Sequence, residues 1–341
     1  MFDNIMSGKP GISLNFIRLP NRAFFSLLAI LLPNWLTFAP LSAQFHPTKA
    51  PVTAIAVAPD GTSILVGSQA GVQILSWPEL RALGELATEL VNVHDLQFSP
   101  DGKTLLAAGG TPAESGIVEQ WDWPAATLQW RVTLADDVVY RAAWLPDGRR
   151  FAVASATSRC AICDRETGQA EVWFSGHSRP VLAIESLGDQ WLVSAGVDQT
   201  IRVWKQDDAL LVRTLDNHLG TVTGIRLDPI ERPGSARRMV TIGHDRTIRL
   251  WNPSVGRMIR FQKLPGQAAC VGWTPDGKTI LVGSSAGDLL ILDSSDLQIR
   301  QSEAANVGAI HELAISPQPT TVLLGGDRGL RALAIPQTDS P

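Results

Sequence analysis

Two stretches of the chain, VSAGVDQTIRVW at residues 193–204 and VTIGHDRTIRLW at residues 240–251, share one pattern. In each stretch an apolar run ends at Gly, a turn containing Asp follows, and a second alternating run ends in Trp. Alternation with a period of two is typical of half-buried strands, and Gly and Asp favour the tight turn between them. Each stretch is therefore predicted to be a β-hairpin.

The hairpins belong to a repeat that begins at Val52. A short apolar segment that ends in Pro or Pro-Asp-Gly, such as VTAIAVAPDG at residues 52–61, precedes each hairpin. The last residue of the apolar segment recurs every 41 to 46 positions, at Pro59, Pro100, Pro146, Gly188, Pro229, Pro275 and Pro317. A fixed period of this length, with four short strands in each unit, predicts seven repeats of an all-β array.

Composition excludes several classes of protein. The 341 residues are 45% hydrophobic and 18% charged, which is enough apolar content for a folded core. The net charge of −4 provides no broad basic surface, so nucleic acid is not an expected partner. Three cysteines are too few for a disulfide framework, and 29 Gly with 22 Pro indicate many turns.

The repeat resembles the WD-repeat β-propeller family. The resemblance is strongest in the two hairpins quoted above, and the second unit has the Trp-Asp pair itself at Trp121 and Asp122. It implies an all-β, seven-bladed β-propeller of four-stranded antiparallel blades over residues 44–341. The fold needs no cofactor.

The resemblance also implies a hydrogen-bonded tetrad of His, Ser or Thr, Asp and Trp in a blade. The matching residues of blade 4 are His177, Ser194, Asp198 and Trp204, and those of blade 5 are His218, Thr241, Asp245 and Trp251. Buried indole and imidazole N–H groups need acceptors, which a hydroxyl and a carboxylate supply. We expect these residues to be structural rather than catalytic.

Residues 1–43 are predicted to be an export signal or a membrane anchor. Three bases and one acid precede the apolar run AFFSLLAILL at residues 23–32, an order typical of a secretory signal cleaved after Ala43. Counted as residues 23–43, the apolar segment is also long enough to span a membrane uncleaved. Either form places the propeller outside the cytoplasm, in the periplasm or secreted. A buried apolar segment or a misassigned start is the remaining alternative.

Blade 7 lacks its outer strand in the sequence, because few residues follow its third strand near Ile335. In propellers a segment from the other terminus commonly fills that position. The candidate is about Leu41–His46, and cleavage after Ala43 would leave residues 44–50 to supply the strand.

Strand alternation indicates which side chains line the central channel. A polar ring of mixed sign is predicted there, which could hold a ligand or an ion and is equally explained as a water-filled channel with solvated charges: Asp95, Gln97, Arg141, Glu185, Arg226 and Glu312. No metal site is predicted, because no cluster of two His and a carboxylate occurs. Cys160, Cys163 and Cys270 are expected to be buried thiols. The Gly-x-Ser-x-Gly match at residues 283–287 is expected to join two strands, not to form a nucleophile elbow.

Two insertions on opposite faces of the disc are candidate recognition loops, with plain surface loops that tolerate insertion as the alternative. One lies at residues 109–115 in blade 2 and includes Glu114, and the other lies at residues 230–238 in blade 5. The second contains Arg232, Arg237 and Arg238, which could meet an acidic partner.

The expected function is that of a noncatalytic scaffold that binds other proteins outside the cytoplasm, with the membrane contacted only through residues 23–43 if these are uncleaved. This expectation rests on the resemblance, since a fold alone does not specify function. Two alternatives stay open. One is a propeller enzyme or small-ligand-binding protein that uses the channel mouth. The other is a cytoplasmic assembly subunit whose apolar N-terminus packs on a partner.

Overall fold

The computed structural model describes residues 44–45, 50–231, 237–317 and 320–335. Contacts divide the chain into residues 1–39 and 40–341, and all described residues belong to the second unit. The predicted signal or anchor and the cleavage point after Ala43 lie outside the described residues. The described part contains no helix that is long and apolar enough to cross a membrane.

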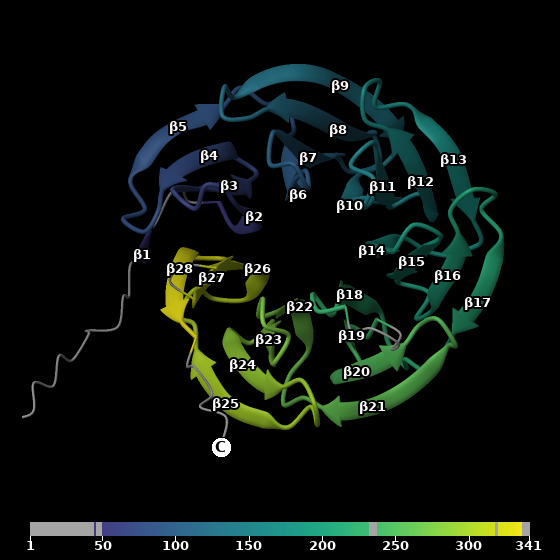
Figure 1. Cartoon of the computed structure of the whole chain (residues 1–341). Helices are drawn as coiled ribbons and strands as arrows, with labels where there is room; N and C mark the ends of the chain where they lie inside the picture. Colours follow the sequence, from purple (N-terminus) through teal and green to yellow (C-terminus); the bar gives the residue numbers. More distant parts are fainter. Residues whose placement is uncertain (1–43, 46–49, 232–236, 318–319, 336–341) are drawn as a thin grey trace, which may run out of the picture. The chain divides into compact units, whose positions relative to one another are not determined.

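The described residues form seven four-stranded antiparallel sheets arranged around a central axis (Figure 1). Blades 1 to 3 contain β2 (Val52–Val57), β3 (Ser63–Ser68), β4 (Gly71–Ser76), β5 (Ala82–Leu86), β6 (Asn92–Phe98), β7 (Thr104–Thr111), β8 (Ser115–Asp122), β9 (Thr127–Ala135), β10 (Val139–Trp144), β11 (Arg150–Ser155), β12 (Arg159–Asp164) and β13 (Ala170–Ser175).

Blades 4 to 6 follow with β14 (Val181–Leu187), β15 (Trp191–Gly196), β16 (Ile201–Lys205), β17 (Leu211–Leu215), β18 (Val222–Leu227), β19 (Met239–Gly243), β20 (Thr247–Asn252), β21 (Arg257–Lys263), β22 (Ala268–Trp273), β23 (Thr279–Ser284), β24 (Asp288–Asp293) and β25 (Ile299–Ala304). Blade 7 contains β26 (Ile310–Pro317), β27 (Thr320–Gly326), β28 (Gly329–Ala334) and β1 (Gln44–Phe45). The predicted fold class is confirmed.

The repeated Pro-Asp-Gly segments form the turns between the first and second strands. In blade 1, Gly61 has a φ of +67°, a conformation that glycine adopts without strain. Asp60 Oδ1 accepts a hydrogen bond of 2.9 Å from the backbone N–H of Thr62, which fixes the turn from within. This local chemistry explains why the motif recurs with the period of the blades.

The core consists of apolar layers between neighbouring sheets. Phe151 of blade 3, for example, is fully buried and belongs to one cluster with Leu106 and Val118 of blade 2. Burying a side chain of this size contributes about 2 kcal/mol. Because both faces of the inner strands are covered in this way, β3, β7 and β23 are almost continuously apolar.

The chain closes the ring by pairing its two ends. Gln44 pairs with Arg331 and Phe45 with Leu330, so that β1 is the outer strand of blade 7 beside β28. This confirms the expectation that a segment before Val52 supplies the missing strand. The pairing covers two residues of the predicted Leu41–His46, and the other four lie outside the described residues.

Candidate functional site

The structure brings the predicted tetrad residues of blade 4 into one hydrogen-bonded chain. His177 Nδ1 lies 2.9 Å from Asp198 Oδ2, and His177 Nε2 lies 2.8 Å from Ser194 Oγ. The indole N–H of Trp204 donates to the same Ser194 oxygen over 2.8 Å. Because a carboxylate only accepts, Nδ1 donates its proton to Asp198 and Nε2 accepts from the hydroxyl.

Blade 5 repeats the arrangement with a threonine in place of the serine. His218 contacts Asp245 over 2.9 Å and Thr241 over 2.8 Å, and Trp251 donates to Thr241 over 2.9 Å. Burial lowers the pKa of His218, as it does that of His177, despite the neighbouring Asp245 carboxylate. A neutral, buried imidazole with both nitrogens bonded inside the blade is a structural element.

The tetrads also fix the loops that enter the blades. Asp245 Oδ2 accepts a bond of 3.0 Å from the backbone N–H of Leu219, whose side chain is 83% exposed. Asp198 accepts from the N–H of Ser178 in the same way over 3.2 Å. A rigid internal network thus holds an exposed loop in one position.

Blade 2 contains a different network that the sequence analysis did not identify. Glu119 on β8 is fully buried and accepts hydrogen bonds from Thr88 Oγ over 2.7 Å and from the indole N–H of Trp121 over 3.1 Å. Arg131 on β9 holds the other oxygen over 2.8 Å and also contacts Glu89 over 2.7 Å. One carboxylate replaces the hydroxyl of the tetrad as the acceptor for the tryptophan.

The predicted channel residues meet near the axis as a charge cluster. This channel charge cluster comprises Asp95 on β6, Arg141 on β10, Glu185 on β14, Arg226 on β18 and Glu312 on β26. Arg141 NH1 lies 2.7 Å from Glu312 Oε2 and 3.4 Å from Asp95 Oδ1. Arg226 lies 3.1 Å from Glu185 and 3.8 Å from Glu312.

Two of these charges, Asp95 and Glu312, are buried and not solvated, whereas the side chains of Arg226 and Glu185 are each 23% exposed. Asp95 is 3% exposed and Glu312 is 8% exposed, and each arginine is shared between two carboxylates. Asp95 also accepts from the backbone N–H of Ala142 over 2.9 Å and from the Gln97 amide over 3.1 Å. Alternation identified the side chains that face the axis, but not that long arginine side chains reach partners across it.

Burial and excess negative charge change the acidity of the cluster. Three carboxylates surround two guanidinium groups, so one negative charge lacks a partner when all are ionised. Burial raises the pKa of Glu185 to about 7; Arg141 opposes this rise and Asp95 adds to it. Burial likewise raises the pKa of Asp95 in spite of Arg141.

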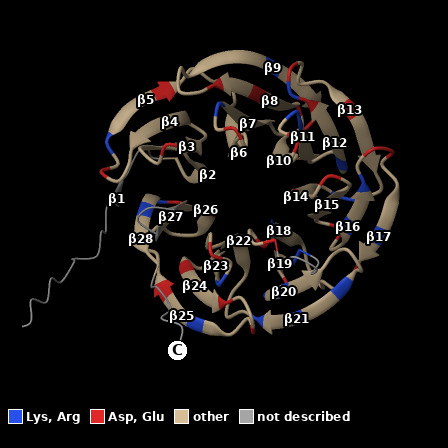
Figure 2. Ribbon diagram, viewed as in Figure 1, with Lys and Arg blue, Asp and Glu red and all other residues tan. Residues whose placement is uncertain are grey.

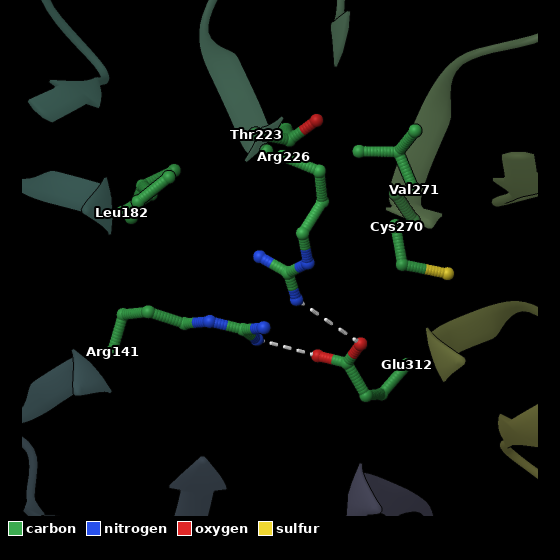
Figure 3. Close-up of a pocket in the computed structure, with 10 residues that line it drawn as sticks. Arg141, Leu182, Thr223, Arg226, Cys270, Val271 and Glu312 are labelled. Carbon is green, nitrogen blue, oxygen red and sulfur yellow. Dashed lines mark hydrogen bonds and ion pairs between the residues drawn. The ribbon is translucent and has the colours of Figure 1, made fainter. Parts of the chain in front are cut away.

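The Arg141–Glu312–Arg226 bridge lines two pockets of the channel. Figure 3 shows the bridge within the first pocket, which Leu182, Thr223, Cys270 and Val271 also line. The second pocket has a volume of about 310 Å³ and shares the same three bridge residues. Its exposed lining is mainly polar, and the apolar residues that also line it are Ile55, Val57, Leu96, Phe98, Leu313 and Ile315.

The arginines predicted for partner binding have partners inside the protein. Arg238 forms an ion pair of 2.8 Å with the fully buried Asp228, and its guanidinium group lies 5.4 Å from the centre of the Trp273 ring. Arg237 donates to the backbone carbonyl of Asp228 over 2.9 Å and lies 3.4 Å from Glu231. These two cations hold the loop rather than standing free, and Arg232 lies outside the described residues.

The insertion in blade 2 extends two strands instead of forming a long loop. β7 and β8 are eight residues each, and only residues 112–114 connect them. Glu114 is exposed in this turn and its backbone N–H donates to the carbonyl of Thr111 over 3.1 Å. The tip therefore offers one exposed acid on a short turn.

The cysteines and the Gly-x-Ser-x-Gly segment lie where strand geometry predicts. Cys160 packs with a cluster of blades 3 and 4, whereas Cys163 packs with a cluster of blades 2 and 3. All three cysteines are buried and unpaired. Ser284 ends β23 and its hydroxyl accepts from the N–H of Asp288 at the start of β24. In the described part of the chain, no group of three or more His, Cys, Asp or Glu could hold a metal ion.

Seven four-stranded blades, two of them with a His–Ser/Thr–Asp–Trp network, define a seven-bladed β-propeller with internal tetrads. The family model described as "WD domain, G-beta repeat" matches residues 169–205, from the outer strand of blade 3 to the third strand of blade 4. The match covers this one segment, and the described residues as a whole form a seven-bladed β-propeller.

Curated relatives share parts of this sequence. The chain is 30% identical over 122 residues to a p21-activated protein kinase-interacting protein 1-like protein of Danio rerio, which covers 36% of this chain and 32% of that protein. It is 28% identical over 215 residues to the uncharacterized WD repeat-containing protein sll1491 of Synechocystis, which covers 61% and 58%. It is 24% identical over 273 residues to telomerase protein component 1 of Rattus norvegicus, 64% of this chain but 10% of that protein.

Proposed function

We propose that the protein is a noncatalytic scaffold that binds other proteins and acts outside the cytoplasm. The observation that carries the proposal is the link from the tetrads to the surface. Asp245 holds the buried His218 and the backbone of the exposed Leu219 at once. A rigid framework that positions exposed loops is the arrangement on which recognition surfaces are built.

Two relatives support the binding of other proteins by their names, one an interacting protein and one a component. The chain spans less than two thirds of each of the three relatives, so their partners are not carried over to this chain. The extracytoplasmic setting is supported by the order of basic and apolar residues within residues 1–43.

Photo-crosslinking in cells tests the binding of partners. A crosslinking residue at Leu219 should capture a discrete protein partner, whereas the same residue at Leu106, which is fully buried between blades 2 and 3, should capture none. Scanning the exposed loops without capturing any protein would contradict a scaffold function.

Fractionation with intact-mass measurement tests the location. A soluble extracytoplasmic species that begins near Gln44 would establish a cleaved signal, and a full-length species in the membrane fraction would establish an anchor. Cytoplasmic activity of a reporter fused at residue 50 would contradict export.

The channel supports a second candidate function, the binding of a small ligand. The pocket of about 310 Å³ has a mainly polar lining on which the charged groups of Arg141, Arg226 and Glu312 converge, and convergent polar groups fix a ligand's orientation in binding sites. Soaking or titration with a panel of small cations and amino acids should then change the intrinsic fluorescence of the protein in a saturable way. A variant with Phe98→Ala should weaken that change without unfolding the propeller.

A further inference from the structure

The outer strand of blade 5 has an unusual surface. β21 has the sequence RMIRFQK, with three cations and no acid, so its charged residues are blue and none is red in Figure 2. Ile259 is 48% exposed and Phe261 is 51% exposed. Arg257, Arg260 and Lys263 are exposed and form no ion pair with any described residue. By contrast, β5, β13 and β25 each contain a glutamate.

β21 is also an open sheet edge. It is the last strand of the order β18-β19-β20-β21, so one side of its backbone has no strand beside it. The N–H of Leu264 donates to the carbonyl of Arg246 over 2.8 Å, and Arg249 pairs with Phe261. Because hydrogen-bonded and non-bonded pairs alternate in an antiparallel ladder, the backbone N–H and C=O groups of Phe261 and Lys263 point away from β20.

The protein holds the central residue of this edge in place. The Arg249 guanidinium group lies 5.8 Å from the centre of the Phe261 ring, and Arg249 is itself 3.3 Å from Asp245 of the tetrad. The Phe261 ring therefore packs against the Arg249 guanidinium group, which the tetrad aspartate holds in place. About half of Phe261 remains exposed, beside its own outward backbone N–H and C=O. The outward C=O of Lys263 accepts a hydrogen bond of 3.1 Å from the Gln262 side-chain amide, which an added strand would displace.

We propose that β21 docks an extended acidic segment of a partner protein, which adds to blade 5 as a fifth strand. The proposal rests on the proposed scaffold function and names the chemistry of its partner. Main-chain hydrogen bonds to Phe261 and Lys263 would supply affinity, as in other strand additions. Specificity would come from the side chains of the added strand: an acid opposite Lys263, an apolar residue opposite Phe261 and an acid opposite Arg260.

Charge decides against a second copy of the same strand. Antiparallel pairing of two β21 strands would place cations of one beside cations of the other, which is destabilising. Cations on an edge strand discourage pairing between copies and favour a strand of opposite charge.

A synthetic peptide tests the proposal on the full-length protein. The blocked, fluorescently labelled peptide Ser-Glu-Thr-Val-Asp-Ser matches the pattern in antiparallel register, and its control carries Lys in place of Glu and Asp. We expect fluorescence anisotropy to show at least tenfold tighter binding of the acidic peptide. The difference should shrink with added salt, because exposed charges are screened.

Phe261→Pro is the sharpest variant. It removes an N–H that points outward and leaves the ladder to β20 intact, as proline on an edge strand permits. Ser302→Pro on β25 is the matched control, because Ser302 pairs with Leu290 at the equivalent position of blade 6. Phe261→Pro should lower the affinity at least tenfold, and Ser302→Pro should leave it unchanged, with unaltered thermal melting in both.

Reversed charges provide a test of specificity. The variant with Arg260→Glu and Lys263→Glu should lose the acidic peptide and bind the lysine peptide. Equal binding of both peptides to the unaltered protein, or full binding to Phe261→Pro, would overturn the proposal. The proposal would also be overturned if anionic lipid vesicles or single-stranded DNA bound more tightly than the peptide. It would be overturned as well if copies of the protein associated with one another and Phe261→Pro abolished that association.

The outcome is separable from that of the scaffold function. If partners are crosslinked at Leu219 but the peptide does not bind, the proposed strand addition at β21 is wrong and the proposed scaffold function is retained. If no partner is captured from any loop but the peptide binds, the edge is a peptide site without a scaffold function around it.

Discussion

Arg141 on β10 and Glu312 on β26 meet near the propeller axis, with 2.7 Å between a guanidinium nitrogen and a carboxylate oxygen. The two residues belong to blades 3 and 7, which are not neighbours in the ring. Glu312 also lies 3.8 Å from Arg226 of blade 5. One carboxylate thus links three blades that share no sheet.

We expect Arg141→Met to destabilise the protein by about 3–5 kcal/mol, because it leaves Asp95 and Glu312 buried without their main cation. Equilibrium unfolding in urea at pH 7 measures the loss. Replacing both partners, Arg141→Met with Glu312→Gln, should recover part of it. A loss below about 1 kcal/mol in the single variant would show that the ion pair adds little to the fold.

Glu185 should make the protein less stable as the pH rises from about 4.5 to 7. Its pKa is about 7 in the folded protein against an ordinary value of 4.5. The folded state therefore binds the proton more tightly, and this stabilisation is lost as the pH rises through that window. At about 1.4 kcal/mol for each pKa unit, the loss is at most roughly 3 kcal/mol.

Glu185→Gln removes this titration and should stabilise the protein at pH 8 relative to pH 5, when each is compared with the unaltered chain. Urea unfolding at the two pH values gives the comparison. Glu114→Gln, an exposed glutamate in a turn, serves as the control and should not change the pH profile. An unchanged profile in Glu185→Gln would assign the pH dependence to other groups.

The tetrad histidines should make the protein sensitive to acid. Burial lowers the pKa of His177 and His218 below 6.5, so the unfolded chain takes up a proton first as the pH falls. Stability is then lost as the pH falls below about 6.5. The measurement is best made in the Glu185→Gln background, because Glu185 titrates with the opposite sign. Replacing both histidines by glutamine should flatten the remaining slope.

Glu119→Gln should cost about 2 kcal/mol, because Arg131 loses a charged, buried acceptor while it stays partly covered. Glu89 contacts the same arginine but its side chain is 75% exposed, so Glu89→Gln should cost under about 1 kcal/mol. Thermal or urea unfolding of the two variants tests the difference. Equal losses would mean that the burial of Glu119 does not determine its contribution.

The sequence predicted the blades and the tetrads because both follow local rules. The period of Pro59 and its equivalents counts the blades, and the spacing from His177 to Trp204 follows the family pattern. Alternation also placed Arg141 and Glu312 on the channel side. It does not give their pairing, since side chains 171 positions apart meet only when the ring is closed.

Two features were missed for different physical reasons. Glu119 lies two residues before Trp121 on the same face of β8, where a charged residue signals a buried acceptor for the indole. It was missed because the family pattern expects that acceptor to be a hydroxyl from another strand. Arg238 was proposed to meet an acidic partner, and the acid that it pairs with is Asp228 of the same chain, which directly follows β18 and is brought beside Arg238 by the hairpin. Such pairing of charges can be predicted only when the positions of both groups in space are known.

The pairing of β1 with β28 has a consequence for how the molecule is made. Gln44 is synthesised 287 positions before Arg331, its partner. Blade 7 therefore cannot be completed before Arg331 has been synthesised, and until then the ring stays open. Anything that acts on the protein in that interval, a chaperone or a transport machine, meets apolar flanks that the finished ring no longer displays.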